Sequence, residues 1–412
     1  MLNFKLFLDA PEYQLRKNTP FSPSKVTWKE LHLAIPKQLF KKSTSKGLSY
    51  VIRDILLALM LYKFAWSLDT IAAMLVKILP VYPTRAWILE WGLWLVYFNT
   101  QGIFLTSLWC LAHEASHGCL SPYTWINDLV GFMLHTFLLV PYFSWKSTHL
   151  SHHASTVSVE RDENYVPATR SDFALAPEDI ANAADYYDAF QEMPIYTALR
   201  LIAMQVLGLI SYLLFNVKGS PRHPPGTNHF NPNASLFKPH ERLGVVMSDI
   251  GIISMVCILV WWTKNVGLGQ FVRLYFIPYL ITNHWIVMLT YLQHTDPTIP
   301  HYRRSQWTFV RGALATVDRP FLGWIGRVFF HNVSHNHISH HLFSSIPFYN
   351  QPIATEYIKK ILKEDYNYDS TNSFRALYRS FVECAFIEDE GNIIFFKNRK
   401  GRASRVLAES ST

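Results

Sequence analysis

The sequence predicts an all-α integral membrane protein: a bundle of about four transmembrane helices, further interfacial helices and a cytosolic helical cap. Three observations support this fold class. Hydrophobic residues make up 50% of the 412 residues and charged residues only 17%, below the roughly 25% that is usual for soluble domains. Six apolar stretches are long enough to cross a membrane or to lie in its interface. Eight of the 18 histidines gather in three short boxes, which predicts a histidine-rich metal site.

Residues 1–49 are predominantly polar, and we expect them to form a cytosolic N-terminal arm rather than a cleavable signal peptide. Within the arm, residues 28–36 predict a short helix on the membrane surface that Pro36 ends. The four cysteines are scattered and form no CxxC pair, which is typical of a reducing compartment. We attribute the net charge of +8 to Lys and Arg beside membrane segments. Nucleic acid is not an expected partner, because no compact basic motif with interleaved aromatic residues is present.

The six apolar stretches are residues 50–68, 86–112, 125–145, 196–217, 245–263 and 271–292. We expect residues 50–293 to form the transmembrane part with the first two histidine boxes. After that point the chain is mostly polar, and residues 294–412 are expected to form a cytosolic cap that carries the third box.

The boxes limit the topology, because all three must lie on one side of the membrane to share a site. Only 31 residues separate His117 from His149, whereas two crossings would need about 40. Residues 125–145 are therefore predicted to form a re-entrant or interfacial hairpin. Three apolar stretches lie between the second and third boxes, but the number of crossings between the boxes must be even. One of the three must therefore lie in the interface, and we assign residues 196–217 to it. The Lys-rich arm places the boxes and both termini in the cytosol.

The boxes contain the side chains that carry the chemistry. Their histidines are His113 and His117 in the first box, His149, His152 and His153 in the second, and His337, His340 and His341 in the third. Residues three or four apart share one face of a helix, so each box can direct its imidazoles to one point. Imidazole is the commonest metal ligand and suits iron, copper or zinc. Because one zinc ion takes only three or four ligands, eight imidazoles indicate two metal ions.

The first box also fits the HExxH pattern of zinc proteases, in which Glu114 would be the general base. A zinc protease needs one further ligand, whereas this chain offers six more box histidines. We therefore favour a supporting role for Glu114, in which its carboxylate orients a ligand imidazole through the free N–H.

Around the boxes, much of the sequence resembles the membrane-bound fatty acid desaturases, and most of all the oleate (Δ12) and ω-3 acyl-lipid desaturases of fungi and plants. The resemblance extends from about residue 18 to residue 400. The stretches that carry it, besides the boxes, are residues 137–146, 160–162, 291–295, 311–319 and 340–344.

The resemblance implies a non-haem di-iron centre held by the eight box histidines and by His294, in the sequence Gln293-His294-Thr295. Glu114, Asp162 and Asp318 are the expected carboxylates beside the ligands. Dioxygen would be the co-substrate, and electrons would come from NADH through cytochrome b5 and its reductase. No nucleotide-binding fingerprint or haem-binding segment is visible in this chain, so these electron donors would be separate proteins.

The implied activity is O2-dependent insertion of a cis double bond into an acyl chain of a membrane phospholipid, from oleoyl to linoleoyl. The acyl chain would lie in an apolar tunnel between the spans. The implied location is the endoplasmic reticulum membrane, multi-pass, with the active site facing the cytosol. No retrieval signal is evident at the C-terminus, so this location follows from the resemblance alone.

Residues beside the ligands depart from the family pattern. Ala115 and Ser116 stand where Cys and Gly are usual, and Leu150 and Ser151 stand where a basic residue is usual. His335 and Asn336 replace an acidic residue and Thr. These departures leave open an acetylenase, conjugase or hydroxylase of the same family, and a catalytically inactive homologue. The HExxH pattern keeps a membrane zinc protease as the alternative from a different class. The double-bond position, the carrier lipid and the oligomeric state stay open as well.

Four histidines outside the boxes have different expected roles. His335 is expected on the surface, and His331 is expected to support the third box. His135 and His284 lie in apolar stretches, where packed or hydrogen-bonded histidines are the usual finding.

Overall fold

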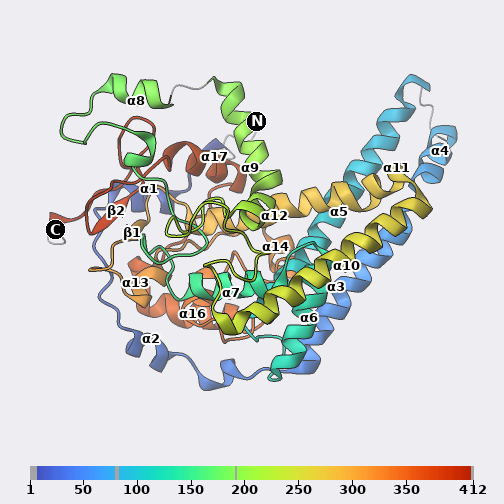
Figure 1. Ribbon diagram of the computed structural model, residues 1–412, viewed down its shortest axis with the longest axis horizontal. Coiled ribbons are helices and arrows are strands. Elements are labelled where there is room, and N and C mark those ends of the chain that lie inside the picture. The colour runs from blue at the N-terminus through green and yellow to red at the C-terminus, as the bar shows by residue number, and fades with distance from the viewer. Residues whose placement is uncertain (1–6, 79–82, 191–192, 410–412) are drawn as a thin grey trace.

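The computed structural model describes residues 7–78, 83–190 and 193–409. The chain is predominantly helical, with long helices that extend from one end of a wider, more compact region (Figure 1). A single two-stranded antiparallel sheet is present among the described residues, formed by β1 (Pro300–Tyr302) and β2 (Ile393–Phe395). The expected all-α class is therefore confirmed apart from this one short ribbon.

The helical bundle is organised around α5 (Pro83–Ser116), which makes its most extensive contacts with four other helices. Its partners are α3 (Thr44–Ala65), α4 (Leu68–Ile78), α6 (Thr124–Phe137) and α12 (Ile277–His294). Helix α10 (Arg242–Val266) packs on α6 and ends at Gly267, whose φ of 86° is easily adopted only by glycine. The short helix α11 (Leu268–Phe271) and a π-helical turn, Val272–Phe276, then lead into α12.

Two helix pairs are sharply bent. Helices α3 and α4 meet at 55°, and α6 meets α7 (Tyr142–His153) at 109°. The second bend falls between Leu138 and Pro141, where Leu139 has a left-handed φ of 56°. This bend fits the hairpin expected for residues 125–145, because α7 turns away from the apolar helix α6 and carries the second histidine box.

Within the described part of the chain, three helices are long and apolar enough to cross a membrane: Ala86–Ser116, Pro194–Phe215 and Pro239–Val266. The number rises to five if each bent pair counts as one span. The second of the three, α9 (Pro194–Phe215), is the stretch we assigned to the interface, whereas the stretch 271–292 is not among them. Helix α9 packs along α12, at an angle to the long helices (Figure 1). The four-span topology therefore stays a prediction.

The third histidine box lies in a region of short helices after α12. These are α13 (Phe309–Leu314), α14 (Trp324–Phe329), α15 (His337–Leu342), α16 (Gln351–Leu362) and α17 (Ser373–Glu383). Helix α15 packs against both α13 and α16, which buries all six of its residues. The third box is thus held by packing on several sides.

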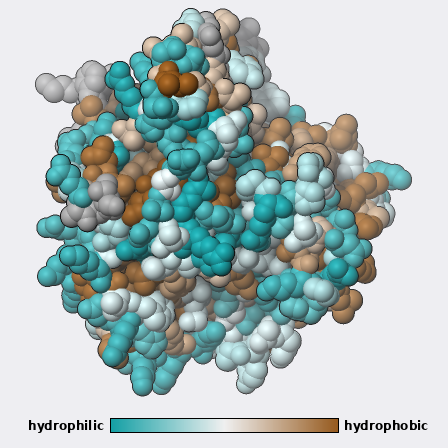
Figure 2. All heavy atoms as spheres, turned by 60° about the vertical axis from the view of Figure 1, so that its left-hand side comes forward, coloured by the Kyte–Doolittle hydropathy of each residue, from teal (hydrophilic) through white to brown (hydrophobic). Residues whose placement is uncertain are grey.

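The N-terminal arm packs against this region. It contains α1 (Pro11–Asn18) and α2 (Trp28–Ala34), the latter at the position expected from the sequence. Thr27 and Glu30 form a capping box that fixes the start of α2. Leu31 of α2 is fully buried in a core cluster that also contains Ile338 and Ile358. The face formed by the arm, the sheet and α8 (Ala183–Phe190) is mostly hydrophilic, with apolar side chains between (Figure 2).

Candidate metal centre

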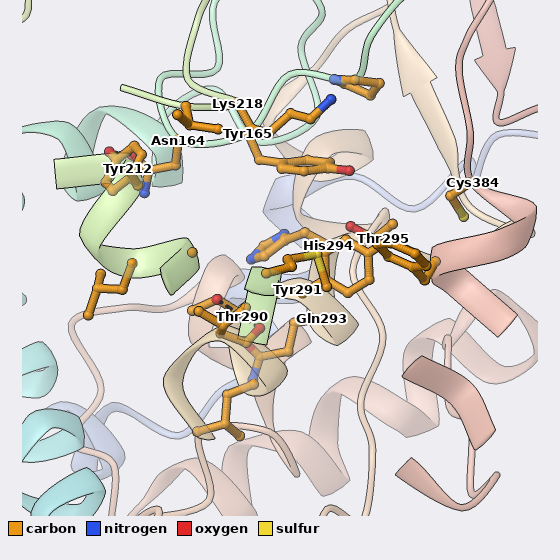
Figure 3. A pocket seen from close by; sticks show the side chains of 18 of the residues that line it. Asn164, Tyr165, Tyr212, Lys218, Thr290, Tyr291, Gln293, His294, Thr295 and Cys384 are labelled. Atoms are coloured by element: carbon orange, nitrogen blue, oxygen red, sulfur yellow. Dashed lines mark hydrogen bonds between the residues drawn. The ribbon is translucent and has the colours of Figure 1, made fainter. Parts of the chain in front are cut away.

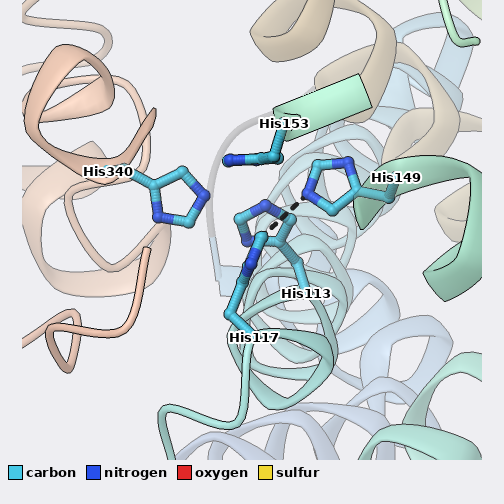
Figure 4. A group of neighbouring side chains, drawn as sticks. All are labelled: His113, His117, His149, His153 and His340. Atoms are coloured by element: carbon cyan, nitrogen blue, oxygen red, sulfur yellow. Dashed lines mark hydrogen bonds between the residues drawn. The ribbon is translucent and has the colours of Figure 1, made fainter. Parts of the chain in front are cut away.

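Five of the expected histidines converge on one point. One ring nitrogen from each lies within 4.8 Å of those of the other four, and the five rings face one another across a small space (Figure 4). This first group consists of His113, His117, His149, His153 and His340. It combines side chains from all three boxes, so it exists only in the folded chain.

The remaining four expected histidines form a second group beside the first. The ligand atoms of His152, His294 and His341 lie within 4.8 Å of one another. His337 joins them, because its Nε2 is 2.9 Å from Nε2 of His294 and 3.0 Å from Nε2 of His341. The two groups adjoin where the rings of His153 and His341 stack, with centroids 3.9 Å apart. All nine ligands expected from the sequence are brought together.

The spacing within the boxes explains how one helix serves two groups. Successive residues on an α-helix are rotated by about 100°, so positions i and i+4 are about 40° apart, whereas i+3 lies on the other side of i. In the second box His149 and His153 belong to the first group and His152 to the second. In the third box His337 and His341 belong to the second group and His340 to the first. Each HxxHH box therefore contributes to both groups.

The ring nitrogens of the two groups are better suited to bind metal ions than to form hydrogen bonds with one another. Burial and the neighbouring histidines hold the pKa values of His153 and His341 well below the usual range, so these rings are neutral at pH 7. The Nε2 atoms of His117 and His149 are 3.0 Å apart, and neither ring nitrogen of His153 has a hydrogen-bond partner. Buried nitrogens without partners cost free energy. Two metal ions would satisfy them, and an all-imidazole set suits iron, copper or zinc.

Asp162 fixes the orientation of one histidine of the second group. Nδ1 of His152 donates to Oδ1 of Asp162 over 2.8 Å, which turns Nε2 of His152 toward His294. The backbone N–H groups of Val157 and Asn164 also donate to this carboxylate. A carboxylate held in this way sets the tautomer and the orientation of a ligand imidazole.

Glu114 has the corresponding place in the first group. Its Oε1 accepts a hydrogen bond from Nδ1 of His113 over 3.1 Å and lies 3.6 Å from Nδ1 of His340. Glu114 thus faces the rings from the side opposite their converging nitrogens. Asp318, the third expected carboxylate, forms no hydrogen bond to an imidazole among the described residues: it accepts hydrogen bonds from the backbone N–H of Ile338 and the hydroxyl of Tyr366. Asp318 therefore holds the start of α15.

A buried ion network, not anticipated from the sequence, holds the chain on both sides of His294. Arg319 donates to the carbonyl of Leu292 and to Asp296, which lie two residues before and two after His294. The network also includes Asp369, Arg379 and, from the N-terminal arm, Arg16. Arg319 lies in the stretch 311–319 that resembles the family, which was the only signal available in the sequence.

The other four histidines lie outside both groups. Nε2 of His331 is 2.8 Å from Asp54 and 3.0 Å from Ser107, so His331 bonds to α3 and α5 instead of the third box. The expectation of a surface position for His335 is wrong: it is only 9% exposed, because α14 packs over it at Gly326. His135 is fully buried among Trp109, Trp145 and Tyr142, as expected. His284 is half-buried beside Trp285 and Phe374.

A cavity of about 380 Å³ reaches both groups of histidines (Figure 3). Its wall includes His113 and His149 of the first group and His152, His294 and His337 of the second. Most of the remaining wall is apolar or aromatic; α9 and α12 contribute the two largest helical shares, and loop residues between 164 and 173 and between 384 and 399 also contribute. A largely apolar cavity with a few polar groups at one end is typical of a small-molecule site. None of the five altered ligand neighbours, Ala115, Ser116, Leu150, Ser151 and Asn336, is among the described residues that line it.

Comparisons with known proteins point to one family. A family model described as fatty acid desaturase matches residues 86–372. The chain is 37% identical over 376 residues to the Delta(12) fatty acid desaturase of Mortierella isabellina, with 90% of each chain covered. It is 38% identical over 393 residues to the Delta(12)-fatty-acid desaturase of Arabidopsis thaliana, covering 94% of this chain and 96% of the relative. It is also 37% identical over 388 residues to an oleoyl-12-hydroxylase of Ricinus communis, with 93% of each chain covered.

Proposed function

Since the chain belongs to the fatty acid desaturase family and is an oxidoreductase, we propose that it converts oleoyl to linoleoyl chains on a membrane lipid, using O2. The relatives named Delta(12) desaturases support the position of the double bond. The observation that carries the proposal is the apolar cavity that ends at both groups of histidines.

The two groups would each hold one non-haem iron ion. The first would be bound by His113, His117, His149, His153 and His340, and the second by His152, His294, His337 and His341. Iron supplies the means to activate O2 for removing hydrogen from an unactivated methylene group, which no protein side chain can do alone.

The chain's own residues position the reactants and exclude water. The aromatic side chains of Trp109 and Trp145 line the cavity and stack on His113 and His149. These rings shield the ligand histidines from solvent and give a methylene chain an apolar contact surface. Asp162 accepts the Nδ1 proton of His152 and Glu114 that of His113, so each ligand keeps its Nε2 lone pair for metal.

Electrons would come from NADH through separate proteins, cytochrome b5 and its reductase, at the cytosolic side of the endoplasmic reticulum membrane. The proposed arrangement has four spans, an arm of residues 1–49 and a cytosolic cap of residues 294–412. The contact between the arm and the cap supports the same side for both.

A hydroxylase is the second candidate, because a relative named an oleoyl-12-hydroxylase is nearly as similar as the desaturases. Acetylenases and conjugases would need the same ligands. The residues that depart from the family pattern lie beside the proposed ligands, and none is among the described residues of the cavity wall. From this position they can affect which product is formed more than which acyl chain is bound. The zinc protease alternative is not supported, since Glu114 faces away from the point on which the nitrogens converge.

The test is expression in a yeast that lacks polyunsaturated lipids, followed by fatty acid analysis with oleate and linoleate supplied separately. Linoleate formed from oleate is expected. The His152→Ala and His294→Ala variants should form none, at equal protein level. A hydroxylated or acetylenic product would replace the desaturase proposal by one of the alternatives, and the absence of any oxidised lipid would contradict both.

A further inference from the structure

A second cavity, of about 370 Å³, adjoins the start of α15. Its wall is mostly polar and comes from α14, α16 and the loops beside them: Pro320, Arg327, His335, Asn336, Pro352, Glu356, Lys359, Tyr366 and Tyr368. Among the described residues it shares no lining residue with the first cavity. Asn336 lines the second cavity and the next residue, His337, lines the first, so the backbone at the start of α15 lies between the two. A polar wall does not suit the acyl chain of the proposed function.

The side-chain amide of Asn336 is oriented by a chain of hydrogen bonds. Nε2 of Gln351 donates to two backbone carbonyls, so Oε1 of Gln351 accepts the hydroxyl of Ser339 over 2.7 Å. The hydroxyl of Thr355 donates in turn to Oγ of Ser339 over 2.8 Å, and Nδ2 of Asn336 donates to Oγ1 of Thr355 over 2.9 Å. Because each hydroxyl has only one proton to donate, the oxygen of the Asn336 amide must be the atom turned away from Thr355.

The amide oxygen of Asn336 lacks a hydrogen-bond donor. Its Oδ1 has no partner among the described residues, and the residue is only 8% exposed. A buried acceptor without a donor costs free energy. Because Asn336 lines the second cavity, a ligand in that cavity with an O–H or N–H group would satisfy this oxygen. The unpartnered Oδ1 therefore distinguishes this cavity from an ordinary surface depression.

Arg327 brings a positive charge to the same cavity. It is exposed on α14, and within the described part of the chain its guanidinium takes part in no hydrogen bond or ion pair. The two other charges of the wall compensate each other, because Nζ of Lys359 is 2.9 Å from Oε1 of Glu356. The ring of His335 contacts the backbone of Gly323 and is not needed to bind an anion. The cavity therefore has a net positive charge, which attracts an anion.

We propose that the second cavity binds a phosphate ligand that carries a hydroxyl group: inorganic phosphate or the phosphate monoester of a small polyol. The guanidinium of Arg327 would bind two oxyanion oxygens through its paired N–H groups. The hydroxyl of the ligand would donate to Oδ1 of Asn336, which a fully deprotonated anion cannot do. Inorganic phosphate keeps such a hydroxyl at pH 7, and a polyol ester supplies it from its alcohol groups. The site is separate from the proposed acyl cavity and does not depend on the proposed reaction.

The experiment measures the affinity of the purified full chain in detergent for three ligands by isothermal titration calorimetry. Inorganic phosphate and glycerol 3-phosphate represent the two sources of the phosphate group. Sulfate is the matched anion, because it has the shape of phosphate and carries no proton at pH 7. At least one phosphate ligand is expected to bind about tenfold more tightly than sulfate, a margin of roughly 1.4 kcal/mol. The phosphate ligand with the larger margin identifies the source.

Three variants locate the site. Arg327→Gln should weaken phosphate binding about tenfold, because it removes the charge-assisted hydrogen bonds to the oxyanion. Asn336→Leu should abolish the margin over sulfate, because it removes Oδ1. The control Arg304→Gln, at an exposed position that is not among the described lining residues, should bind phosphate as the unmodified protein does. Iron content is measured in each variant, because Asn336 adjoins His337 and because iron itself binds phosphate.

Equal affinity for sulfate and both phosphate ligands in the unmodified protein would overturn the proposal. Phosphate binding that Arg327→Gln leaves unchanged at equal iron content would overturn it too, since the anion would then lie elsewhere. A margin that persists in Asn336→Leu has the same consequence. If Asn336→Leu does not fold, the sulfate comparison and Arg327→Gln, at an exposed position, still decide the question. A protein that forms no linoleate and still shows both effects would keep the phosphate site and contradict only the proposed reaction.

Discussion

Asp162 accepts the Nδ1 proton of His152 over 2.8 Å, and two backbone N–H groups hold the same carboxylate in place. The loop after the second box thus fixes the one histidine of that box that belongs to the second group. The two residues are only ten positions apart in the sequence, which places the carboxylate beside the ring.

The Asp162→Asn change should reduce both metal retention and activity by about tenfold to a hundredfold, the usual effect of removing the carboxylate partner of a ligand histidine. The neutral amide oxygen accepts a weaker hydrogen bond from Nδ1 of His152 than the carboxylate does, so the ring is held less firmly in its orientation. Iron content per chain, measured by inductively coupled plasma mass spectrometry, and product formation are the readouts. Asp179→Asn, at an exposed position, is the control. Full iron and full activity in Asp162→Asn would contradict the prediction.

Removal of a histidine from either group should affect mainly the ion of that group. We expect two irons per chain in the unmodified protein, with about one lost in His117→Ala and about one in His294→Ala, and no activity in either. His284→Ala, at a half-buried position outside both groups, should keep both irons. Mössbauer spectra of iron-57 protein would show whether the iron that remains differs between the two variants. Zinc in place of iron in the active protein would contradict this prediction.

Arg16 connects the N-terminal arm to the buried ions beside His294. Its Nε donates to Thr298 over 2.7 Å, and its Nη2 lies 3.6 Å from Asp296. Arg16→Ala should lower the free energy of unfolding by about 3 kcal/mol, because it leaves a buried carboxylate with one fewer cation. A thermal shift in detergent measures the loss, and Lys17→Ala, an exposed neighbour on the same helix, should change it little. Equal melting temperatures for both variants would count against the role of Arg16.

The topology can be tested with epitope tags in microsomes. Tags at both termini and beside Glu178 should be accessible from the cytosolic side. The loop at Glu178 bonds to Lys397 near the C-terminus, so the two must share one side. A tag between the first two spans, at residues 79–82, should be protected; these positions lie outside the described residues. A protected tag beside Glu178 would contradict the parity argument.

Helix geometry predicted that the box histidines would converge, and the family resemblance added His294. The division of these nine histidines between two groups was not predicted. The spacing of His149, His152 and His153 fixes which rings share a face of α7, but only the packing of α7 against α5 and α15 determines which rings meet. The burial of His335 has the same origin, because it depends on how the preceding helix α14 packs over it. Apolar composition does not separate spanning from interfacial helices: α9 is long and apolar enough to cross a membrane, so its expected interfacial position stays a prediction.

The pairing of the two ends of the chain has a consequence for biosynthesis. The backbone of Phe21 exchanges hydrogen bonds with Val406 and Ala408, although nearly the whole chain separates them. A ribosome releases residue 21 long before it has made residue 406, so the arm must wait without its partner while the membrane helices insert. Residues 406 and 408 then pair with Phe21, which lies between α1 and α2. A nascent chain that stops short of them would carry all nine histidines and still lack this closure.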